Sequence, residues 1–528
     1  MPNKLPVELL GDIFGRLPNL RHPHPLSLAV VSHVCRYWRE VTLNTSSLWT
    51  HIPFTHGSTW AMEALNRSKP SPIHLDIKIG FLNNASYKKA VCTVLAQQPN
   101  LKTLRVDDAD HPGIDNFGFE TRSEIIQALA ARAQPSLESL ELLGREYSNE
   151  AWEYLLEKMT SHHLRNLTTS NCPFPPDSPI LFLSSLSHLE ITDSFDAWST
   201  IDSLLDALSA LSSLKSLSLT TEYASLIRYP YVTPRRGRHL VHLPQLEFFC
   251  LEDTFSVTEA ILQALSLPTT TEIVIGPHTE DDEECPSDAS KLGGALLSHF
   301  TEAVVADAAF QSVSVDIYYS PMTISISLTA SQPRNPFSSS TNDTSLPDRT
   351  SFAICCDRER SGLAASMFNY ITELPVLQNV RSVEIRTQYD QNDLFVLDAP
   401  TTVVFWQPLF AAFARLSPEL HIDGPCAHAV VSAMHSPSFR PHFASLHSLH
   451  IAHVDFAARS IAGLAFFAAL LAGMERKSID GNPLSCLVIK DCVVNVVAEV
   501  VEDLRRYLGH RDAVRWDQDG TGTGIVNS

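Results

Sequence analysis

Apolar residues recur at helical spacing near the start of the chain. Their spacing of i, i+3, i+4 and i+7 places them on one face of a helix. These residues are Leu10, Ile13, Phe14 and Leu17. Pro6 suits the first turn of this helix, because a first-turn N–H would have no partner there. The pattern therefore predicts an amphipathic helix that begins close to residue 6.

Two further short helices are expected before residue 45. The segment 22–25, with prolines at two of its four positions, ends the first helix, and residues 26–31 form the second. Ser32 is a suitable N-cap for a third helix, whose apolar side is lined by Val34, Trp38 and Val41. A helical unit this short cannot bury so many large apolar groups by itself, so we expect a partner surface.

A different pattern predicts strands in the rest of the chain. The phrase Leu-x-x-Leu-x-Leu, which is typical of leucine-rich repeats, recurs with substitutions. Its copies begin at residues 101, 137, 164, 186, 214, 246, 310, 380, 446 and 484. Helical apolar spacing separates some copies, as in residues 152–159 and 201–208. Such strand–helix units bury their apolar faces only by stacking, so we expect an α/β solenoid, an irregular leucine-rich-repeat horseshoe, after a small all-α module.

The phrase also predicts which side chains face away from the core. Residues at positions three and five of each copy point opposite to the leucines, because strand side chains alternate between faces. We expect this concave surface to bind a target, mainly through Arg105, Glu141, Glu190, Phe248, Glu384 and His450. The mixed, partly acidic set suits a protein or peptide ligand, and the alternative is a solvated face without a ligand.

The N-terminal residues resemble the F-box family in its fungal form. The resemblance covers about a tenth of the chain. It runs in order through Leu5-Pro6, Glu8-Leu9, Ile13-Phe14, Val31-Ser32, Val34-Cys35-Arg36, Trp38-Arg39 and Leu48-Trp49.

This resemblance implies docking onto the Skp-type adaptor of an SCF-type cullin-RING ubiquitin ligase, and through it onto a cullin. The rest of the chain would then select an unknown target protein. The residues implied to contact the adaptor are Leu5, Pro6, Leu9, Ile13, Phe14, Val31, Cys35, Trp38 and Trp49. The alternative is a helical cap on the following domain, in which the Leu and Trp residues are core.

Charge and composition narrow the range of partners. The formal net charge of −20 would repel phosphate backbones and anionic lipids, so neither nucleic acid nor a membrane is expected as a partner. The longest apolar run, residues 461–473, is shorter than the roughly 20 residues that cross a bilayer. No secretory signal pattern opens the chain, so we expect a location in the cytoplasm and/or nucleus. The ten cysteines have no paired spacing that would indicate a disulfide framework or a zinc site.

The expected organisation follows from these patterns. Residues 1–55 form the docking module, 56–70 a connecting helix or linker, 71–515 the repeat domain and 516–528 a disordered tail. Within the repeat domain we expect an acidic loop at 277–290, a disordered loop at 331–350 and an antiparallel β insertion at 310–357.

None of the familiar catalytic or nucleotide-binding motifs is present in the sequence. Phosphate-binding loops, His-Glu-x-x-His helices and Gly-x-Ser-x-Gly elbows are absent, so we expect no catalytic residues and no cofactor. His447 and His450 would face opposite sides of one strand, so we expect no metal site there. The favoured function is a non-catalytic substrate receptor. The alternatives are a protein-binding scaffold or inhibitor without ubiquitin transfer, and an enzyme with an unfamiliar site in residues 290–400.

Overall fold

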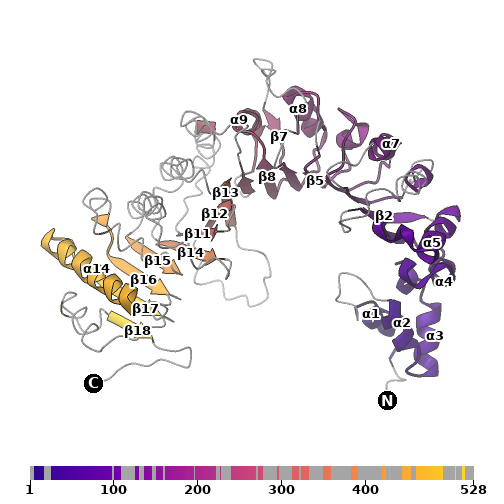
Figure 1. Cartoon of the computed structure of the whole chain (residues 1–528), viewed down its shortest axis with the longest axis horizontal. Helices are drawn as coiled ribbons and strands as arrows, with labels where there is room; N and C mark the ends of the chain where they lie inside the picture. Colours follow the sequence, from indigo (N-terminus) through magenta and orange to yellow (C-terminus); the bar gives the residue numbers. More distant parts are fainter. Residues whose placement is uncertain are drawn as a thin grey trace. The chain divides into compact units, whose positions relative to one another are not determined.

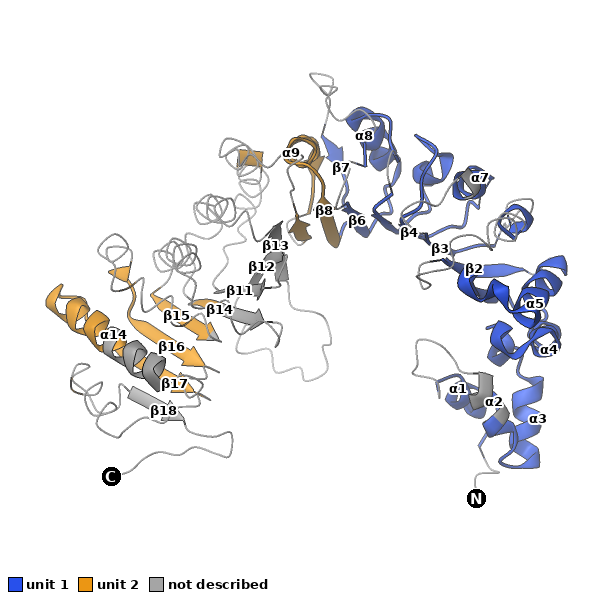
Figure 2. Ribbon diagram, in the orientation of Figure 1, with its two compact units in different colours: residues 1–246 blue, residues 247–528 orange. Residues whose placement is uncertain are grey.

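The structure is a computed structural model of the 528-residue chain. It describes residues 5–16, 25–97, 100–108, 125–129, 136–144, 150–158, 161–194, 197–221, 226–227, 240–268, 271–276, 294–295, 312–319, 323–331, 349–357, 382–389, 418–423, 427, 434, 443–452, 460–490, 506 and 514–517. The predicted acidic loop at 277–290, the core of the 331–350 loop, most of the 516–528 tail and Leu17 lie outside these residues. Two compact units, 1–246 and 247–528, are described separately (Figure 2).

The first unit opens with three α-helices and a 3-10 turn, α1 (Val7–Arg16), α2 (Pro25–Ser32), α3 (Arg36–Asn44) and η2 (Ser46–Trp49). Their small core is made by Leu10, Phe14, Val31 and Val41, with Tyr37, Trp38 and Leu48 packed against it. The N-cap of α3 is Cys35, whose Sγ accepts a hydrogen bond from the Trp38 backbone N at 3.4 Å. The prediction that Ser32 would cap this helix is wrong, because α2 continues through Ser32 and a two-residue turn follows.

The next elements along the chain are η3 (Phe54–His56), α4 (Ser58–Ser68), β1 (Ile73–Lys78), η4 (Ile79–Asn83) and α5 (Ala85–Ala96), of which β1 is the first strand of the sheet. Gly57 precedes α4 with φ +84° and ψ 174°, a conformation that only glycine adopts readily. Asn84 caps α5, because its side chain accepts hydrogen bonds from the backbone N–H groups of Ser86 and Tyr87.

Six parallel strands in chain order form the sheet of the first unit. After β1 these are β2 (Leu101–Asp107), β3 (Ser139–Leu143), β4 (Asn166–Ser170), β5 (His188–Thr192) and β6 (Ser216–Thr220), and β7 (Val241–His242) follows. Between them lie α7 (Glu150–Lys158), η5 (Pro179–Phe182) and α8 (Ile201–Ala210). Figure 1 shows α7 and α8 along one side of the strands, and alternating positions of β4 and β6 are buried.

The second unit is a sheet in the order β8-β10-β13-β12-β11-β14-β15-β16-β17-β18. The strands are β8 (Phe248–Glu252), β10 (Glu272–Ile275), β11 (Ser312–Tyr319), β12 (Thr323–Ser331), β13 (Arg349–Asp357), β14 (Ser382–Tyr389), β15 (Glu419–Asp423), β16 (Ser448–Ala452), β17 (Cys486–Lys490) and β18 (Val514–Asp517). The unit also contains α9 (Phe255–Ala264), β9 (Leu265–Ser266) and α14 (Ser460–Ile479). β12 is antiparallel to both of its neighbours and lies inside the segment 310–357, where an antiparallel insertion was predicted.

The recurring phrase predicted many of the strands. Each copy coincides with a strand, and the parallel strands with intervening helices resemble a leucine-rich-repeat solenoid. The phrase did not predict β1, β10 or β18. It also did not predict β15, because Ser417 stands where the first leucine would be, although Leu420 and Ile422 fit the later positions. Among the described residues, no helix combines the length and the apolar character needed to cross a membrane.

Candidate functional site

The helical module exposes a group of large apolar side chains. We call this group the docking face, and it consists of Leu5, Val7, Leu9, Ile13, Val30 and Val34, each between 40% and 66% exposed. On α1, Leu9 and Ile13 are four residues apart and therefore lie on the same side of the helix. Leu10 and Phe14, one residue further along, are each 1% exposed and face the module's core. The helix is thus apolar on two sides, and only one of them is covered.

The interior of the module holds the docking face in place. The Phe14 and Trp38 rings pack with centroids 5.0 Å apart, and Tyr37 Oη donates a hydrogen bond to the Leu5 carbonyl at 2.8 Å. Trp49 Nε1 donates to the Thr42 carbonyl at 2.8 Å, and the Arg67 guanidinium lies 5.1 Å from its ring. These contacts connect α1, α3, η2 and α4, so the exposed side chains stand on a packed base.

The structure divides the predicted adaptor-contact residues into two groups. Leu5, Pro6, Leu9 and Ile13 are exposed, and Cys35 and Trp38 are half-buried. Phe14, Val31 and Trp49 are buried, with Phe14 and Val31 in the module's core, and their contact with an adaptor stays a prediction. The predicted adaptor contacts did not include Val7, Val30 or Val34, and Val34, which was expected on the apolar side of the third helix, lies in the turn between α2 and α3.

A row of polar side chains crosses the strands of the first unit. We call it the charged row, and its members are opposite one another in the parallel register: Asp76, Arg105, Glu141, Thr168 and Glu190. Arg105 Nη1 lies 2.9 Å from Glu141 Oε1, and Arg105 Nη2 lies 3.3 Å from Asp107 Oδ2. Thr168 Oγ1 donates to Glu190 Oε2 at 3.3 Å. Three predicted target-contact residues, Arg105, Glu141 and Glu190, are therefore brought together.

Electrostatics within the charged row favour an ionised Arg105. Partial burial opposes its charge, but the carboxylates of Glu141, Asp107 and Asp76 outweigh this effect and raise its pKa. Partial burial also raises the pKa of Glu141, while Arg105 lowers it and Asp76, Asp107 and Glu190 raise it further. The row therefore carries more negative than positive charge around a single guanidinium.

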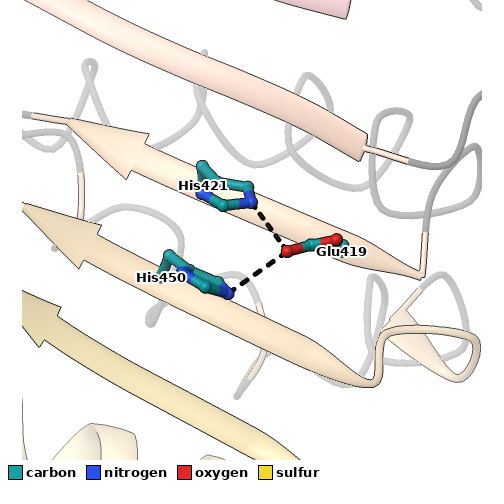
Figure 3. Close-up of side chains that lie close together, drawn as sticks. All are labelled: Glu419, His421 and His450. Atoms are coloured by element: carbon teal, nitrogen blue, oxygen red, sulfur yellow. Dashed lines mark hydrogen bonds and ion pairs between the residues drawn. The ribbon is translucent and has the colours of Figure 1, made fainter. Parts of the chain in front are cut away.

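The remaining predicted target-contact residues lie in the second unit. Phe248 is half-buried at the start of β8, and Glu384, His421 and His450 are opposite one another on β14, β15 and β16. Figure 3 shows that His421 and His450 both point toward Glu419. His421 Nε2 lies 2.9 Å and His450 Nε2 3.3 Å from Glu419 Oε1, and the two rings stack with centroids 4.0 Å apart.

The sequence did not indicate this cluster. The prediction concerned only His447 and His450, which were expected to face opposite sides of one strand and therefore not to share a metal ion. The spatial neighbour of His450 is His421, 29 residues earlier, on the adjacent strand. Because β15 was not predicted, the sequence alone did not bring these two residues together.

Comparison with known proteins gives a family match for the N-terminal helical module. Residues 2–55 match the F-box-like family. No curated protein matches the chain. Among solved structures, a leucine-rich-repeat protein of Leptospira interrogans is similar at 10% identity, covering 80% of this chain and 97% of that one, with a TM-score of 0.18. The chain thus carries an F-box-like domain at its N-terminus, followed by parallel strands and helices that resemble leucine-rich repeats.

Proposed function

We propose that the protein is a non-catalytic substrate-recognition subunit of an SCF-type cullin-RING ubiquitin ligase. Its F-box-like domain would dock onto a Skp-type adaptor, and its repeat strands would hold a target protein. The observation that carries this proposal is the docking face, a set of exposed apolar side chains within the residues that match the F-box-like family. The proposal places the complex in the cytoplasm and/or nucleus.

The docking face has the properties of a protein-binding surface. Large apolar side chains that are half exposed in the free chain gain free energy when a partner covers them, about 25 cal/mol per Å² of apolar area. Isolated exposed apolar residues are ordinary, but several on one small module indicate an interaction site. The packed base under the face limits the ordering cost of binding.

The charged row would contribute to choosing the target. Arg105 is surrounded by Asp76, Asp107 and Glu141, and Glu190 extends the acidic character by two strands. Such a surface attracts basic segments and repels acidic ones. The proposed mechanism is proximity: one chain binds the ligase and the target together and thereby raises the effective concentration of the target's lysines.

Co-purification of the full-length chain with a Skp-type adaptor tests the docking step. The double variant Leu9→Ala/Ile13→Ala should weaken adaptor binding by tenfold or more, because it truncates two exposed apolar groups without touching the core. Ile479→Ala is the matched control, since Ile479 is 75% exposed in the second unit. Undiminished binding by the double variant, or no binding by the intact chain, would refute the proposal.

A second measurement separates the receptor from a scaffold or inhibitor. Proteins captured by the intact chain and by the Leu9→Ala/Ile13→Ala variant should be compared for their cellular half-lives. If the protein is a receptor, partners captured by both chains should have longer half-lives in cells that express the variant than in cells that express the intact chain. Equal half-lives would favour a scaffold.

A further inference from the structure

We propose that Glu419, His421 and His450, the histidine cluster, form a binding site for a divalent transition-metal ion of the zinc type. The site would use three protein ligands and leave coordination open on the exposed face of the strands. Among the residues that the structure describes, this is the only group of three or more His, Cys, Asp or Glu side chains with suitable spacing. The inference is independent of the proposed role in ubiquitin transfer.

The fold itself brings the three side chains together. Glu419 and His421 are two residues apart on β15, so they project from the same face of the sheet. His450 lies directly opposite His421 in the parallel register between β15 and β16. Backbone pairing keeps adjacent strands about 4.8 Å apart, which sets the spacing between the two imidazoles. The cluster therefore rests on regular strand geometry and not on a loop.

The distances between the ligand atoms fit a small metal ion. A tetrahedral zinc site with bonds of about 2.0–2.2 Å places its ligand atoms roughly 3.3–3.6 Å apart. The two imidazole Nε2 atoms lie 2.9 Å and 3.3 Å from Glu419 Oε1, and all three ligand atoms lie within 4.8 Å of one another. Small side-chain rotations are enough to surround an ion.

The donor set selects the class of ion. Imidazole nitrogens suit zinc, copper, iron and nickel, whereas magnesium and calcium prefer all-oxygen sites. Without an ion, each Nε2–H can donate to Glu419 Oε1. In the ion-bound form each histidine would carry its proton on Nδ1 and stay neutral, so that its Nε2 lone pair is donated to the ion. Ser448 Oγ, which lies 2.9 Å from His450 Nε2, gives up this contact when the ion binds.

The site is accessible as well as restrained. The side chains of Glu419, His421 and His450 are 40%, 33% and 26% exposed, so an ion can enter from solvent. The stacked rings, with 24° between their planes, limit the orientations that each imidazole can take. Three protein ligands are typical of zinc sites that keep a position for water or for a group on a bound molecule.

Equilibrium dialysis of the metal-stripped full-length chain against Zn²⁺, followed by measurement of bound metal, tests the site. We expect one ion per chain bound by the cluster in addition to any bound elsewhere. His421→Ala and His450→Ala should each remove this ion. Glu419→Gln should weaken its binding by tenfold or more, because it keeps the side-chain shape but loses the charge. His447→Ala is the matched control, since His447 is exposed and lies just before β16.

Cobalt substitution gives an independent readout. The d–d absorption of four-coordinate Co²⁺ should appear with the intact chain and with His447→Ala, and disappear with His421→Ala. Thermal unfolding of each variant in the presence of a chelator checks that the fold is retained, and Glu419→Gln serves if an alanine variant unfolds. Unchanged zinc content in the His421→Ala and His450→Ala variants would overturn the proposal, as would an intact chain that binds no zinc.

Discussion

Arg105 Nη1 lies 2.9 Å from Glu141 Oε1 across the neighbouring parallel strands β2 and β3. The same guanidinium reaches Asp107, which is almost fully buried, and lies 3.9 Å from Asp76 on β1. One cation therefore interacts with carboxylates from three strands at the start of the sheet. Because both partners are about one-third exposed, the pair is partly shielded from water.

Replacing this cation should destabilise the first unit. Arg105→Ala leaves Asp76, Asp107 and Glu141 close together without a counter-charge, and we expect a loss of about 1–2 kcal/mol, between the values of surface and buried pairs. The urea midpoint of the first unit, followed by hydrogen exchange of the β2 and β3 amides, measures this loss. Lys102→Ala is the control, because the Lys102–Glu138 pair is 3.8 Å long and more exposed. Equal losses for the two variants would contradict this account.

Alanine substitutions of two neighbouring apolar residues of α1 should differ strongly in their effect on stability. Phe14→Ala opens a cavity beside Trp38 and should cost about 3–5 kcal/mol of stability in the helical module. Ile13→Ala should change stability by less than about 0.5 kcal/mol, because Ile13 is 43% exposed. Limited proteolysis of the two variants measures the difference. A strongly destabilised Ile13→Ala chain would show that this side of α1 is covered in the free protein.

The junction between the helices and the sheet should be sensitive to acid. His51 and His74 stack with ring centroids 4.3 Å apart, and His74 Nδ1 lies 2.8 Å from Thr103 Oγ1. Burial lowers the pKa of both histidines, and the proximity of His51 and Lys102 contributes to bringing the pKa of His74 from 6.5 to about 4.

Because the pKa of His74 is lower in the folded chain than in the unfolded chain, the stability should fall as the pH is lowered. Between pH 6.5 and about 4 the unfolded chain binds more protons at His74 than the folded chain does. The stabilisation from a neutral His74 is therefore complete above pH 6.5 and falls as the pH is lowered toward 4. Allowing for solvent screening, we expect a loss on the order of 1–2 kcal/mol.

Hydrogen exchange of the β1 amides at pH 7 and pH 5 measures the acid sensitivity. His74→Asn should reduce the difference between the two values, since it removes a titrating group and keeps a polar atom near Thr103. His188→Asn is the control, because His188 is exposed on β5. A pH dependence that is the same in the His74→Asn variant would contradict the assignment.

Two glycines with positive φ should differ in their tolerance of alanine. Gly57 has φ +84°, and a Cβ there would lie 2.9 Å from Ser86 Oγ. Gly481 has φ +81°, but a Cβ would meet nothing within 4 Å. Backbone strain alone should cost about 1 kcal/mol in Gly481→Ala, and strain plus crowding about 2 kcal/mol in Gly57→Ala. Urea midpoints compared with the parent chain test this order, and equal shifts would argue against crowding at Gly57.

Strand positions could be predicted from the sequence because their signal is local. The apolar residues of Leu101–Val106 and Leu214–Leu219 are separated by polar residues. β2 covers the first segment, and β6 begins two residues into the second. The outward direction of Arg105, Glu141 and Glu190 followed from the same alternation. β15 was not predicted because Ser417 occupies the position of the first leucine of the phrase, although the later positions fit.

The sequence by itself determined the positions of the strands that carry the leucine phrase, the inward and outward positions within them, and the resemblance of the first residues to the F-box family. These properties depend on periodicity within short segments. The tertiary structure alone decided that Phe14 is buried while Ile13 is exposed, because both fit one broad apolar pattern and only packing against α3 separates them. It also decided that His450 lies beside His421 and Glu419. The strand register brings together residues that are far apart in the chain, and the local sequence of either segment does not reveal this register.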